Sequence, residues 1–165
     1  MTVQMSAPVY QFRPMRADDF PLIKRWLAEP HVVEWWGNPD EQYELVSTDL
    51  DEPAMDQFIV AVDDRPFGYI QSLDLEAWPD PAFGDQPRGA RGIDQFIGEP
   101  DMIARGHGSA FIRVFVDDLV ARGVPRVITD PDPMNGRAIR AYEKAGFRRE
   151  RVVDTVSGSA LLMVR

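Results

Sequence analysis

Short blocks of hydrophobic and polar residues follow one another along this chain, and their period changes several times. Alternating or continuous apolar blocks predict strands over residues 9–15, 58–62, 67–73, 93–98, 126–129, 149–156 and 160–165. Apolar residues at helical spacing predict helices over residues 18–29, 40–50, 106–122 and 135–145. The order of these elements predicts an α/β fold with one mixed central sheet. We expect residues 9–165 to form a single domain after a loose leader of residues 1–8.

Local signals set the boundaries of these elements. Asp18 and Asp19 are expected to cap the first helix, and Pro30 is expected to end it. Residues 63–66, Asp-Asp-Arg-Pro, predict the turn of a hairpin between the second and third strands. Residues 75–92 contain three prolines and three glycines and predict a long loop. Such a loop inside a compact domain is usually functional or disordered.

The composition narrows the classes of function. Lysine and arginine number 18 against 27 aspartate and glutamate residues, so the net charge is −9. This balance argues against a nucleic-acid partner and favours either a cationic ligand or solubility alone. The absence of cysteine excludes a thiol nucleophile and a cysteine zinc site, and two histidines cannot form an all-histidine metal site. No apolar run reaches the roughly 18 residues of a membrane span and no signal peptide is found, so we expect a cytoplasmic protein with neither metal nor membrane contact.

The strongest chemical signal is a strand, a turn and a helix over residues 93–122. The turn Arg105-Gly106-His107-Gly108-Ser109 places two glycines where the helix begins. Glycine lets backbone N–H groups approach a ligand closely, and a helix N-terminus adds partial positive charge. The turn therefore suits a pyrophosphate, although it is neither a Walker A loop nor a dinucleotide fingerprint. Taken alone, it is equally consistent with a simple connecting turn.

A second signal lies on the last predicted helix. Asn135 and Tyr142 are seven residues apart, so they lie on one face of the helix with Ile139 between them. A tyrosine placed in this way serves either as a proton donor or as a core aromatic residue, and the spacing leaves both roles open. The side chain of Asn135 is suited to hydrogen-bonding an amide.

These two segments resemble the Gcn5-related N-acetyltransferase (GNAT) superfamily. The resemblance runs from about residue 10 to the end and rests on the turn over residues 105–108 and the helix over residues 135–147. Within the superfamily the chain is most similar to aminoglycoside 6′-N-acetyltransferases. The segments that carry this closer similarity are His31–Gly37, Gly68–Ser72, Arg91–Gln95, Thr129–Pro131 and Ala138–Arg140.

The resemblance implies an enzyme, monomeric or homodimeric, that transfers acetyl from acetyl-coenzyme A (acetyl-CoA) to a primary amine of a cationic small molecule. It implies that Asp94 takes the proton from the amine and that Tyr142 protonates the leaving thiolate. Without this role, Asp94 is expected to cap a strand edge or to pair with Arg91. The residues assigned to acetyl-CoA are Gln95, Phe96, Ile97, Arg105, Gly106, His107, Gly108, Ser109, Asn135 and Ala138.

The residues that bind the acceptor of the acetyl group are predicted from residue type and position. Trp35 and Trp36 are expected to form a wall for a sugar ring, although at least one of them is expected in the core. Asp130 follows a short strand, where it either meets the acceptor or forms the turn before Pro131. Ile103 departs from the superfamily, in which many members carry Gln or Arg at that place, and this removes one side-chain contact with the pyrophosphate.

Three other functions stay open at this point. A siderophore-biosynthesis acyltransferase is expected to carry a histidine in the middle of the sheet, and residues 71–76 contain none. A ribosomal-protein N-terminal acetyltransferase is the second alternative. The third is a non-catalytic sensor of coenzyme A, against which the presence of both Asp94 and Tyr142 argues.

Overall fold

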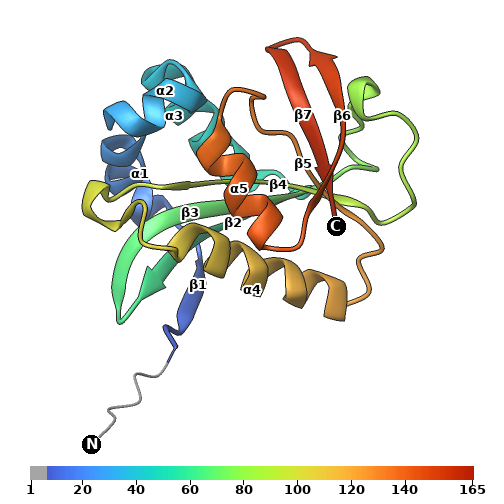
Figure 1. The fold of residues 1–165 in the computed structure, drawn as a ribbon. Helices are drawn as coiled ribbons and strands as arrows, with labels where there is room; N and C mark the ends of the chain where they lie inside the picture. The colour runs from blue at the N-terminus through green and yellow to red at the C-terminus, as the bar shows by residue number, and fades with distance from the viewer. Residues whose placement is uncertain (1–6) are drawn as a thin grey trace, which may run out of the picture.

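A computed structural model describes residues 7–165, and a twisted seven-stranded sheet runs through its centre (Figure 1). The strands are β1 (Tyr10–Pro14), β2 (Met55–Val62), β3 (Arg65–Asp74), β4 (Arg91–Ile97), β5 (Val127–Thr129), β6 (Arg148–Thr155) and β7 (Gly158–Val164). They lie in the order β1-β2-β3-β4-β5-β7-β6. The neighbours β4 and β5 are parallel and the other neighbouring pairs are antiparallel. The predicted α/β class with a mixed sheet is therefore confirmed.

Helices cover both faces of the sheet (Figure 1). One face carries α1 (Phe20–Leu27), α2 (Pro30–Trp36) and α3 (Pro39–Thr48), and the other carries α4 (His107–Ala121) and α5 (Gly136–Lys144). Short 3-10 turns occur at residues 17–19, 49–51, 81–83 and 100–102. Within residues 7–165, every helix is too short or too polar to cross a lipid bilayer.

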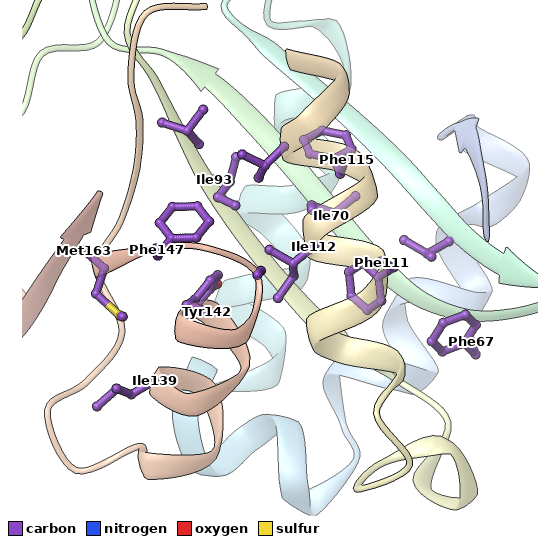
Figure 2. Close-up of a cluster of buried hydrophobic side chains, with 14 of the residues drawn as sticks. Phe67, Ile70, Ile93, Phe111, Ile112, Phe115, Ile139, Tyr142, Phe147 and Met163 are labelled. Carbon is purple, nitrogen blue, oxygen red and sulfur yellow. The ribbon is translucent and has the colours of Figure 1, made fainter. Parts of the chain in front are cut away.

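The alternation of side chains along the strands builds a separate core on each face. On the side of α4 and α5, strand residues such as Ile70 and Ile93 pack against Phe111, Ile112 and other buried side chains (Figure 2). On the side of α1 to α3, Trp26, Ile59, Tyr69 and Phe96 form the second core. Neighbours such as Tyr69 and Ile70 enter opposite cores because successive side chains of a strand point to opposite faces.

Three local predictions are corrected by the structure. Residues 30–36 form α2, with Pro30 in the first helical turn, where its missing N–H removes no hydrogen bond. Asp19 precedes α1 but does not cap it, because its carboxylate accepts hydrogen bonds from the Arg16 backbone and the Arg13 guanidinium. The hairpin turn consists of Asp63 and Asp64 alone, with φ values of 50° and 63°, so β3 already begins at the next residue. Residues 1–6 of the predicted leader lie outside the described residues.

Gly98 follows β4 at a point where the chain has no room for a side chain. A Cβ there would lie 2.1 Å from Cγ of Trp26, which is fully buried and donates to Glu99 at 2.9 Å. We expect Gly98→Ala to lower the free energy of unfolding by about 1–3 kcal/mol or more, because an overpacked core must shift. Gly108→Ala is the control, since its Cβ would meet nothing closer than 3.8 Å. Urea unfolding of the ligand-free proteins measures both, and equal losses would contradict the packing described here.

Candidate active site

A cleft of about 630 Å³ opens where β4 and β5 separate. The two strands pair through Arg91 with Val127 and through Gly92 with Ile128. After these two pairs the backbone pairing between β4 and β5 stops. The last hydrogen bond between the two strands is from the Thr129 hydroxyl to the Ile93 carbonyl, at 3.2 Å. Because β4 continues along β3 to residue 97, its other backbone edge faces the cleft. Such an edge offers N–H and C=O groups to the amides of an extended ligand.

The N-terminus of α4 forms one end of this cleft. Gly106 is the N-cap residue with φ 82°, and Ala104 just before it has φ 58°. Left-handed residues at a helix start turn successive N–H groups inward, which makes a concavity that binds anions. Gly106, Gly108 and Ser109 all line the cleft. The backbone of this turn is thus suited to an anion, as its sequence predicts.

Most of the predicted cofactor residues meet in this cleft. Those that line it are Gln95, Phe96, Ile97, Gly106, Gly108, Ser109, Asn135 and Ala138. Arg105, the first residue of the turn, is exposed and is not part of the lining. The His107 side chain also lies outside the lining, because its Nδ1 is 2.8 Å from the hydroxyl of Tyr10 on β1 and its ring packs on Phe67. His107 thus attaches the start of α4 to the edge of the sheet.

Two carboxylates, Asp94 and Asp130, line the same cleft. Burial raises the pKa of Asp94, and a hydrogen bond from Gln71 Nε2 to Asp94 Oδ2, 3.1 Å long, works in the opposite direction. Burial, followed by the charges of Asp94 and Asp80, raises the pKa of Asp130 to about 7. Arg91 pairs with Asp56 at 3.0 Å, so it leaves Asp94 free of an arginine partner. The pair is suited to attracting an ammonium group and accepting its proton.

Tyr142 is a core aromatic residue that also lines the cleft. Its ring is only 4% exposed and packs with Phe147 and its neighbours in the core (Figure 2). Its hydroxyl nevertheless lies at the cleft, 3.5 Å from Nε2 of Gln95. Burial raises the pKa of this phenol above its ordinary value, so the hydroxyl keeps its proton at neutral pH. The geometry supplies a proton donor next to the free edge of β4.

The two adjacent tryptophans differ in their surroundings. Trp35 is 39% exposed and lines the cleft, as expected for a wall that receives a ligand ring. Trp36 also reaches the lining, but its ring packs edge-on against Phe96 and Tyr69. Asp130 lines the same cleft, so all three predicted acceptor residues belong to its lining.

A family model described as an acetyltransferase (GNAT) domain matches residues 16–155. The chain belongs to the acetyltransferase (GNAT) family. Membership confirms the predicted superfamily and the predicted class of enzyme. The cleft between β4 and β5, with the glycine turn of α4 in its lining, is therefore the candidate active site of this acetyltransferase.

Individual relatives show which group of acetyltransferases this chain resembles. The chain is 34% identical over 162 residues to an aminoglycoside N(6′)-acetyltransferase type 1 of Klebsiella pneumoniae, covering 93% of this chain and 81% of that one. It is 44% identical over 78 residues to a kanamycin resistance protein of Rhizobium radiobacter, covering 47% and 72% of the two chains. An aminoglycoside acetyltransferase solved with coenzyme A and kanamycin matches at a TM-score of 0.85 and 33% identity, covering 95% of this chain and 94% of that one. The predicted closeness to aminoglycoside 6′-N-acetyltransferases is confirmed.

Several cleft residues of the acetyltransferase were not predicted from the sequence. Gln71 lines the cleft and bonds Asp94, a pairing that follows from the register between β3 and β4. His31 of α2 also lines it, and its Nε2 lies 2.7 Å from the carbonyl oxygen of Ile97 at the end of β4. On α5, Arg137, Arg140 and Lys144 place positive charge along the cleft. In the sequence, this basic row could have been recognised because all three residues fall at exposed positions of the predicted helix.

The raised pKa of Asp130 has a consequence for stability. An acid with a higher pKa in the folded state destabilises the fold when ionised, so the penalty is absent well below pH 4 and complete above about pH 7. Asp130→Asn removes the penalty, and we expect its gain in unfolding free energy to be about 2–3 kcal/mol larger at pH 8 than at pH 5. Thermal unfolding at the two pH values tests this, with Asp85→Asn at an exposed position as control. The same gain at both pH values would contradict the assignment of a buried charge.

Proposed function

We propose that this acetyltransferase transfers the acetyl group of acetyl-CoA to the 6′-amine of an aminoglycoside. The observation that carries the proposal is that Asp94 and Asp130 line the same cleft as the glycine turn of α4. Aminoglycosides bear several ammonium groups, and a pair of half-buried carboxylates is complementary to such a ligand. The 34% identity with the Klebsiella pneumoniae enzyme supports the same substrate class.

The residues of the cleft fit acetyl-CoA at three places. The N–H groups around Gly106 and Gly108 suit the pyrophosphate, and Gly108 carries no Cβ to obstruct their approach. The free edge of β4 over residues 95–97 offers hydrogen-bond partners to the pantetheine amides, and the basic row on α5 suits further phosphate oxygens. When bound, acetyl-CoA supplies a thioester that is activated for acyl transfer. The solved relative that holds coenzyme A and kanamycin supports this choice.

The side chains divide the proton transfers of the reaction between them. Asp130 holds the ammonium form of the acceptor by charge, and Asp94 accepts a proton from it, directly or through water. Tyr142 is protonated at neutral pH and donates a proton to the leaving sulfur. Trp35 gives a sugar ring an apolar face on which to pack. No covalent acyl-enzyme is needed, because the chain contains no cysteine and the amine itself is the nucleophile.

A substrate panel tests this proposal against the alternatives that the sequence left open. Thiol release from acetyl-CoA is measured with kanamycin, with a hydroxylysine derivative and with a peptide that has a free N-terminus. We expect saturable release with kanamycin, and a rise of its KM with ionic strength because salt screens the carboxylates. Turnover confined to the hydroxylysine derivative or to the peptide would overturn the proposal in favour of the corresponding alternative. Binding of acetyl-CoA without any turnover would indicate a sensor.

A further inference from the structure

Four side chains form a row across the sheet that ends at the cleft. Gln57 on β2 is the register partner of Gln71 on β3, and Gln71 is the partner of Asp94 on β4. Tyr69 lies two residues before Gln71, so its side chain points to the same face of the sheet. The register of three neighbouring strands therefore brings one phenol, two amides and one carboxyl group together.

Hydrogen bonds connect three of these groups in sequence. Tyr69 Oη donates to Gln71 Oε1 at 2.7 Å, and Gln71 Nε2 donates to Asp94 Oδ2 at 3.1 Å. At the other end, Gln57 Nε2 donates to the carbonyl oxygen of Val46 at 2.8 Å. Tyr69 is fully buried and Gln57 is 7% exposed, so water has little access to this end of the row.

The direction of each bond follows from the groups that it joins. A backbone carbonyl only accepts hydrogen bonds, so the contact with Val46 fixes which end of the Gln57 amide is nitrogen. Tyr69 Oη donates its hydrogen to Gln71 Oε1, so the oxygen end of the Gln71 amide faces Tyr69. The nitrogen of Gln71 is then left to face Asp94.

We propose that Tyr69 is a positioning residue, which holds the Gln71 amide with its nitrogen toward Asp94 and thereby keeps Asp94 as a carboxylate that faces the cleft. We call the series Tyr69, Gln71 and Asp94 the donor chain. With the Gln71 amide reversed, its oxygen would face the carboxylate, and two acceptors would meet unless Asp94 held a proton. The donor chain opposes this reversal from inside the core, beyond the reach of the substrate.

The importance of the donor chain for catalysis rests on the proposed function, in which Asp94 receives the proton of the amine. Burial favours the protonated form of Asp94, which would be useless as a base. The other titratable groups near it are Asp130 and the phenol of Tyr142 on α5, and Asp49 faces Tyr69 from the far side. Among these groups the Gln71 amide is a neutral donor that favours the ionised form of Asp94.

The test is a titration of the Asp94 side-chain carboxyl by carbon-13 NMR in the ligand-free protein, with the resonance assigned by its loss in Asp94→Asn. In Tyr69→Phe the ring remains but the donor to Gln71 is lost, so we expect the Asp94 titration to move upward by about 1 pH unit. Gln71→Met should give a shift in the same direction, and the double variant should shift no further than Gln71→Met alone. The acid limb of the kcat profile should follow, with the KM for acetyl-CoA unchanged.

A control and a fallback variant keep the outcome decisive. Tyr43→Phe is the matched control, because its ring packs on Phe20 at the margin of the same core and outside the donor chain, and it should leave the titration in place. If Tyr69→Phe does not fold, Gln71→Met serves instead, since it removes the amide that Tyr69 orients. A wild-type titration in Tyr69→Phe or in its replacement, or an equal shift in Tyr43→Phe, would overturn the proposal. Failure of the proposed function is seen separately, as full activity of Asp94→Asn.

Discussion

Replacing Asp94 by asparagine is expected to lower kcat for kanamycin by about 10²-fold or more, within the range of general-base catalysis. Asparagine has nearly the same shape and still accepts the hydrogen bond from Gln71, so the cleft keeps its geometry. It also removes a buried charge, so the variant should be at least as stable as the wild type. Acetyl-CoA affinity should barely change, because Asp94 serves the acceptor.

The matched control for this prediction is Asp56→Asn on β2, which β3 separates from β4 in the sheet. Asp56 pairs with Arg91 outside the cleft lining, so the same chemical change there should leave the rate within about twofold of wild type. Steady-state rates and calorimetric cofactor affinities are measured on the same preparations. A wild-type rate in Asp94→Asn would assign this residue a structural role only.

A valine at Gly108 is expected to weaken acetyl-CoA binding by about 100-fold or more. The new side chain would stand among the N–H groups at the start of α4, where the pyrophosphate has to approach the backbone. A Cβ at this position meets only Ile97 Cδ1 at 3.8 Å, so the ligand-free fold should tolerate the first carbon of the new side chain. The loss should therefore appear in binding and not in the melting temperature.

Ala121→Val provides the control for Gly108→Val. It adds a valine to the same helix at its exposed far end, where no part of the cleft lies. Calorimetric titration of the two variants with acetyl-CoA separates local obstruction from a general effect on α4. Unchanged affinity in a folded Gly108→Val protein would remove the pyrophosphate from this turn.

The elements with local boundary signals were predictable from the sequence. Gly106 and Gly123 bracket α4, and the side chain of Asn135 caps α5 by accepting from the backbone N–H of Ala138. The same rules missed α2, because Pro30 reads as the end of one helix and also suits the first turn of the next. Local sequence does not decide between these two uses of proline.

The site was predictable as far as residue types and the family resemblance reach. Asp94, Tyr142 and most of the glycine turn line one cleft, and their roles there stay predictions. The contact of His107 with Tyr10 was not predictable, because it joins residues 97 positions apart. The pairing of Gln71 with Asp94 depends on the register between β3 and β4, which the long loop between these strands does not fix.

The pKa of Asp130 lies beyond sequence reasoning for a related reason. It depends on burial and on the approach of Asp80 from the long loop after β3, and neither follows from the neighbours of Asp130 along the chain. Sequence identified the loop as functional or disordered, and the structure brings one of its carboxylates close enough to matter. Electrostatics of this kind comes from tertiary structure alone.

The position of the acetyl group in the product tests the central claim most directly. The enzyme is incubated with acetyl-CoA and kanamycin, and the modified nitrogen is identified by NMR of the purified product. We expect a single acetyl group on the 6′-nitrogen, formed by the wild type and by Asp56→Asn and nearly lost in Asp94→Asn. Acetylation of a different amine, or no acetylation of kanamycin by the wild type, would contradict the proposed function.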